Sequence, residues 1–81
     1  MTNPELIASA GRALFGAQWQ VPLAQLLGVN ERTMRRIAQA EREGADYPFA
    51  PGALADLAQA LRERRETLSE ALAQVEAALR R

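Results

Sequence analysis

The last third of this 81-residue chain contains no glycine or proline after Gly52, the two residue types that most often interrupt a helix. Apolar residues recur there at spacings of four and three: Leu54, Ala58, Leu61, Leu68, Leu72, Val75 and Leu79. Arg65 interrupts this pattern between Leu61 and Leu68. A helix over residues 53–80 would be about 42 Å long, which is longer than one small domain can cover. This feature predicts an all-α protein of four or five helices with a long C-terminal helix.

The apolar stripe of this helix is expected to make two different contacts. Leu54, Leu57 and Leu61 would pack on the rest of the chain. The remaining residues are predicted to form a homodimer interface: Leu68, Leu72, Val75 and Leu79. Two alternatives stay open, because the helix could fold back on its own core, and Thr67–Glu70 resembles a capping box that would split it in two.

Composition argues against several classes of protein. The chain has no cysteine and no histidine, which removes disulfides, thiolate metal sites and the commonest general base. No catalytic residue, metal or cofactor is therefore expected. The start lacks the pattern of a signal peptide, and no run of about 18 apolar residues is present. We expect a cytoplasmic protein without a membrane segment.

The net charge is zero, but the charges are unevenly distributed. Every basic residue is arginine, and three of them fall within five positions: Arg32, Arg35 and Arg36. Arginine can bind phosphate or guanine through two parallel hydrogen bonds. Charge alone favours a solvated helix face as the explanation of this cluster, so its place in the fold decides its meaning.

Caps and breakers divide residues 1–50 into three expected helices. Their starts and stops are Asn3 with Pro4 and Gly16, Pro22 and Gly28, and Asn30 and Gly44. The turn-rich segment 47–52 then leads into the long helix. We therefore predict a first unit at 1–50 and a helical dimerisation segment at 51–81.

Two residues of the first unit suggest close packing. Gly11 lies inside the first expected helix, where glycine costs about 1 kcal/mol relative to alanine, and contact with another helix would explain it. Trp19 is expected to cover the core against that helix, with stacking on nucleic-acid bases as the alternative.

Residues 20–37, QVPLAQLLGVNERTMRRI, resemble the helix-turn-helix of Cro and lambda-repressor-type regulators. Ala24 is small where two helices would cross, and Gly28 stands in the turn. Apolar residues occupy the shared core: Leu23, Leu27, Val29, Met34 and Ile37. Many relatives carry an aromatic residue where Ile37 stands. The longer stretch 14–57 is similar in layout to anti-CRISPR-associated repressors, which silence their own operon.

The resemblance implies that residues 1–50 are a helix-turn-helix DNA-binding domain. Residues 31–43 would form its recognition helix in the major groove of double-stranded DNA. The expected base contacts are Glu31, Arg32, Arg35, Arg36 and Gln39. The expected phosphate contacts are Gln20, Asn30 and Thr33, with the amides at the start of the preceding helix. A dimer would read an inverted repeat with half-sites roughly 34 Å apart and repress transcription by blocking polymerase, although activation stays open.

A protein-interaction module is the alternative function. In this interpretation, an antitoxin-like or adaptor protein uses the arginine-rich helix to bind an acidic partner. Zero net charge and the strong C-terminal helix favour it. Salt dependence separates the two functions, because phosphate contacts make DNA binding fall steeply with salt.

Overall fold

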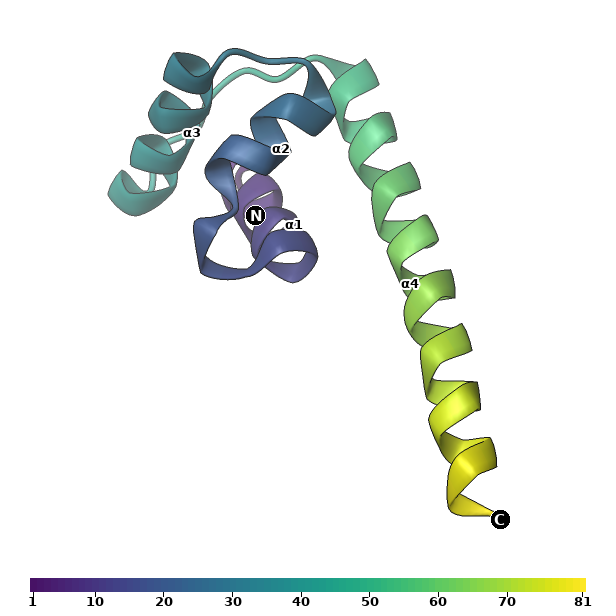
Figure 1. Ribbon diagram of the computed structural model, residues 1–81. Coiled ribbons are helices and arrows are strands. Elements are labelled where there is room, and N and C mark those ends of the chain that lie inside the picture. Colours follow the sequence, from purple (N-terminus) through teal and green to yellow (C-terminus); the bar gives the residue numbers. More distant parts are fainter.

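The computed structural model describes residues 1–81 and is entirely helical. The elements in chain order are α1 (Asn3–Phe15), the short 3-10 helix η1 (Gly16–Gln18), α2 (Gln20–Leu27), α3 (Glu31–Glu43) and α4 (Pro51–Leu79). Helices α3 and α4 lie on opposite sides of the α1–α2 pair (Figure 1). The molecule measures 51 × 23 × 22 Å, because α4 extends well beyond the other helices. The predicted all-α fold with a long C-terminal helix is confirmed.

The core forms where α1, α2 and α3 meet. Its fully buried large apolar side chains come from all three helices: Ile7, Leu23, Met34 and Ile37. Ala24 and Ala38 are also buried, and their small size allows α2 and α3 to lie close together. Leu57 of α4 completes the cluster. The predicted inward positions on α2 and α3 are therefore confirmed for the most part, whereas Leu27 and Val29 are only partly buried at the edge of the cluster.

The start of α1 differs from the prediction. Thr2 rather than Asn3 is the N-cap, and its Oγ1 accepts a hydrogen bond from the Glu5 amide at 3.3 Å. The Asn3 amide donates instead to Oδ1 of Asp46, which also accepts from the Tyr47 amide. Threonine and asparagine are both favoured N-caps, and the long-range contact with Asp46 is invisible in the local sequence.

Trp19 joins α1 to α2 through close contact with Gly11. The indole is only 3% exposed, and a Cβ on Gly11 would lie 2.6 Å from its Cε3 atom and 3.0 Å from Cδ2 of Leu23. The expectation of close packing at Gly11 is therefore confirmed, with the indole ring as the nearest neighbour. Because the ring is buried, it has no free face on which a base could stack.

Arg12 extends this contact to α3. Its guanidinium lies 5.7 Å from the centre of the Trp19 ring, a cation–π arrangement. The same group donates hydrogen bonds to both carboxylate oxygens of Glu41, at 2.9 and 3.4 Å. Arg12 thus connects α1, the indole and α3.

Helix α4 is continuous, and only its first turns belong to the core. Leu57 is buried and Leu61 packs at the edge of the cluster, whereas every residue from Arg62 onward is exposed. The Thr67 hydroxyl donates to the carbonyl oxygen of Glu63 four residues earlier, as inside a helix. Neither the split at the capping box nor the fold-back occurs. The predicted division after residue 50 coincides with the start of α4, but residues up to Leu61 share one core with residues 1–50.

Replacing Gly11 with Ala is expected to lower the free energy of unfolding by about 1–3 kcal/mol, because the new methyl group would displace the Trp19 ring. Thermal or urea denaturation measures the change. Gly52→Ala is the matched control, because nothing lies within 4 Å of that position and its φ is not left-handed. Equal stabilities for the two variants would show that the ring moves aside without cost.

Candidate nucleic-acid interface

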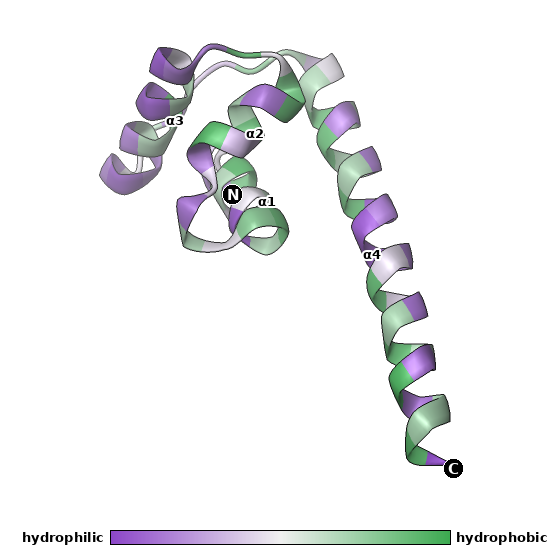
Figure 2. Ribbon diagram, viewed as in Figure 1, coloured by the Kyte–Doolittle hydropathy of each residue, from purple (hydrophilic) through white to green (hydrophobic).

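One side of α3 is polar and exposed. With 3.6 residues per turn, its exposed residues fall on one continuous arc, which we call the α3 polar face. The face consists of Glu31, Arg32, Arg35, Arg36, Gln39, Arg42 and Glu43. The opposite side of the helix, through Met34 and Ile37, is fixed in the core. Figure 2 shows this contrast, with the outer surface of α3 strongly hydrophilic. All residues predicted to contact bases lie on this face.

The arginines of the α3 polar face are free of ion pairs. The structure contains a single ion pair, Arg12–Glu41, which lies outside the face. On the face itself, Gln39 Nε2 donates to Glu43 Oε1 at 2.9 Å. Arginines outnumber glutamates there, so the face is positively charged although the whole chain has no net charge. Its guanidinium groups are available to an anionic or hydrogen-bond-accepting partner.

Two residues, Gly28 and Asn30, shape the turn between α2 and α3. Gly28 takes the left-handed conformation, with φ 66° and ψ 27°, which glycine adopts at little cost. Asn30 Oδ1 then caps α3 by accepting a hydrogen bond from the Thr33 amide at 3.1 Å. Both predicted phosphate contacts at this turn, Asn30 and Thr33, therefore have a structural role at the start of α3.

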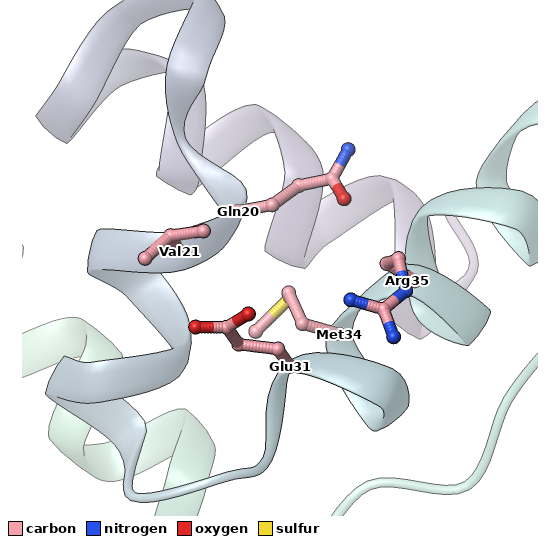
Figure 3. A pocket seen from close by; sticks show the side chains of 5 residues that line it. All are labelled: Gln20, Val21, Glu31, Met34 and Arg35. Carbon is pink, nitrogen blue, oxygen red and sulfur yellow. The ribbon is translucent and has the colours of Figure 1, made fainter.

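The start of α2 lies beside the start of α3. Trp19 gives α2 no side-chain cap, and the first amides of a helix lack partners within the helix and carry partial positive charge. A pocket of about 100 Å³ opens between the two helix starts, lined by Gln20, Val21, Glu31, Met34 and Arg35. In Figure 3, Val21 of α2 faces the three α3 side chains. The fold thus brings Gln20 together with two of the predicted base contacts.

Two residues of this region were missed at the level of sequence. Val21 is 47% exposed beside the pocket, whereas valine is more often buried in the core. Arg42 extends the α3 polar face by one more turn. Its distance of seven residues from Arg35 was the signal that would have identified it, because residues seven apart share one helix face.

The predicted dimer contacts lie far from this region, on the projecting part of α4. They are strongly exposed: Leu68 at 55%, Leu72 at 58%, Val75 at 58% and Leu79 at 79%. They do not contribute to the α3 polar face or to the pocket. The candidate residues therefore form two separate surfaces on the molecule.

No group of three or more His, Cys, Asp or Glu side chains is placed to hold a metal ion. None of the helices combines the length and the apolar character needed to cross a membrane. Comparison with known proteins gives no match to a family model, a curated protein or a solved structure. Function is therefore inferred from the geometry and chemistry of the chain.

Replacing Gly28 with Val is expected to destabilise the fold by about 1–3 kcal/mol, because a β-branched residue is strained in the left-handed conformation. Gly28→Asn is the matched control, because asparagine tolerates this conformation and no atom lies within 4 Å of a Cβ there. Thermal denaturation compares the two variants. A valine variant as stable as the asparagine variant would contradict this role for the turn.

Proposed function

We propose that this protein binds double-stranded DNA sequence-specifically through α3 and acts as a dimeric transcriptional repressor. The observation that carries the proposal is the α3 polar face, which holds unpaired arginines on a helix fixed in the core by its other side. An α-helix fits the major groove of B-DNA, where base edges display distinct donors and acceptors. Base contacts must be held in position, and the buried side of α3 supplies that rigidity.

The polar residues of α3 suit different parts of the DNA. Arg32, Arg35 and Arg36 would donate pairs of hydrogen bonds to guanine or hold a phosphate. Gln39 would pair with adenine, and Glu31 would accept from cytosine. Glu31 and Arg35 both line the pocket, so the two would read neighbouring positions.

Phosphate contacts would come from the two helix starts. Gln20 and the first amides of α2 form one donor group, supported by the absence of a side-chain cap there. The Asn30 side-chain nitrogen and the Thr33 hydroxyl would form a second group, since the cap uses only Oδ1 of Asn30 and the amide of Thr33. Contacts of this kind fix the position of α3 in the groove without reading sequence.

The dimer is supported by the exposed apolar stripe of α4. Leaving such a stripe in water is unfavourable by about 25 cal/mol per Å² of apolar surface, and a two-fold pair is the commonest way to cover it. Two copies would present two recognition helices to an inverted repeat. Bound at a promoter, the dimer would exclude polymerase. The proposal includes a cytoplasmic location and involves neither catalysis nor a cofactor.

A protein-interaction module is the second candidate function. It is favoured by the zero net charge of the chain, since DNA-binding domains are commonly basic, and by the projecting α4. In that case the α3 polar face would bind an acidic protein surface. A salt titration distinguishes the candidates, because release of counterions from DNA gives a steep linear dependence of log affinity on log salt.

Arg35→Ala and Arg36→Ala are each expected to weaken specific DNA binding by about 1–3 kcal/mol where the arginine contacts a base. The melting temperature should hardly change, because neither residue is buried or paired. Arg64→Ala is the matched control, since it removes an exposed arginine from α4. Gel shift and calorimetry on a selected DNA sequence measure both effects. If the Arg64 variant loses as much specific affinity as the α3 variants, the assignment of the face is wrong.

Leu72→Arg is expected to convert the dimer to a monomer and to reduce affinity for the inverted repeat, because it places a charge in the apolar stripe. Gln74→Arg adds the same charge on a different side of α4 and serves as the control. Sedimentation gives the oligomeric state, and gel shift gives the affinity. A Leu72 variant that remains dimeric and binds with full affinity would exclude this surface as the interface.

A further inference from the structure

We infer that two copies of this chain pair through the projecting part of α4 in antiparallel orientation. The inference rests on the proposed dimer and adds the direction of pairing, which the apolar stripe alone does not determine. Three observations carry it: the use of the same stripe by the chain's own core, the position of Arg65, and the positions of Glu66 and Arg81.

The projecting apolar residues continue a face that the chain's own core already uses. Leu61 packs against the core, and Leu68 follows it by seven residues. Seven residues of an α-helix return to within about 20° of the same direction. Leu68 therefore points to the side of α4 on which α1 and α2 lie, but beyond their edge.

A parallel pair is blocked by this arrangement. Packed helices run about 8–10 Å apart, and α4 continues without a break from Leu79 back to Pro51. In a parallel pair, the N-terminal part of the partner's α4 would run along the side of this α4 that carries Leu57 and Leu61. Helices α1 and α2 already occupy that space. In an antiparallel pair, only the far end of the partner's helix approaches α1 and α2.

The apolar residues fit one antiparallel register. Leu68 faces the partner's Leu79, and Leu72 faces the partner's Val75, so the four side chains of each copy are all covered. Arg65 then lies beyond the partner's last apolar residue, between the part of α4 buried by its own core and the part buried by the partner. A parallel register would instead place Arg65 against the same residue of the other copy, where two like charges repel.

One pair of opposite charges meets in this register. The start of the segment carries both signs, with Glu63 and Glu66 among Arg62, Arg64 and Arg65, and its end carries Arg80 and Arg81. All of these side chains are exposed and free of ion pairs within the chain. Antiparallel pairing places Arg81 of each copy opposite Glu66 of the other, whereas parallel pairing would set like charges together.

Spin labels at two exposed positions of the full chain test the direction of pairing. The protein has no cysteine, so Arg62→Cys and Ala73→Cys each accept one label per copy. In the antiparallel register, the two labels at position 62 lie about 35 Å apart along the helices, at 1.5 Å per residue. In either orientation, position 73 lies at nearly the same level on both helices. Its labels are therefore separated mainly across the pair, whose helix axes lie about 8–10 Å apart. This position serves as the control.

A long distance at position 62 together with a short one at position 73 is the expected result. Short distances at both positions would overturn the antiparallel inference while leaving the proposed dimer intact. Loss of both signals, with a monomer in sedimentation of the unlabelled protein, would overturn the inference and the proposed dimer together. Unchanged melting temperatures for both variants confirm that the labelled chains are folded.

Discussion

The packing of the Trp19 ring against Gly11 is the contact on which the other helices depend. It brings α2 against α1 at a distance that no larger residue at position 11 would allow. Arg12 lies over the ring and pairs with Glu41, so α3 also reaches this contact, while Met34 and Ile37 hold α3 in the core. The direction in which the α3 polar face points is therefore fixed from the rear, by residues that have no part in that face.

Neutral overall charge and a positive α3 face have a combined physical consequence. A protein without net charge gains little long-range attraction to DNA or to other polyanions. Binding would then depend on close, well-oriented contacts by a few arginines, which favours discrimination between sequences over general affinity. Among the acidic residues elsewhere in the chain, Glu41 and Asp46 have structural partners and lie off the face.

Local chemistry made much of the fold predictable from the sequence. Gly28 and Asn30 each suit one backbone position, and the spacing of Met34 and Ile37 defines the inner side of α3 without further information. Long-range pairings were not predictable, because nothing near Arg12 or Asn3 in the sequence indicates Glu41 or Asp46. The candidate site followed the same division: the exposed face of α3 was evident from periodicity, whereas the approach of Val21 depends on how two helix starts meet.

The length of α4 has a consequence for how two copies would meet DNA. In the antiparallel pair, Leu57 of one copy and Leu57 of the other lie about 50 Å apart along the helices, at 1.5 Å per residue. This exceeds the roughly 34 Å of one turn of DNA expected for a compact dimer. The length of α4 would then set the distance between two DNA-reading domains. Inserting a heptad between Leu61 and Leu68 would keep every apolar contact and increase the spacing of the half-sites, leaving the recognition residues untouched.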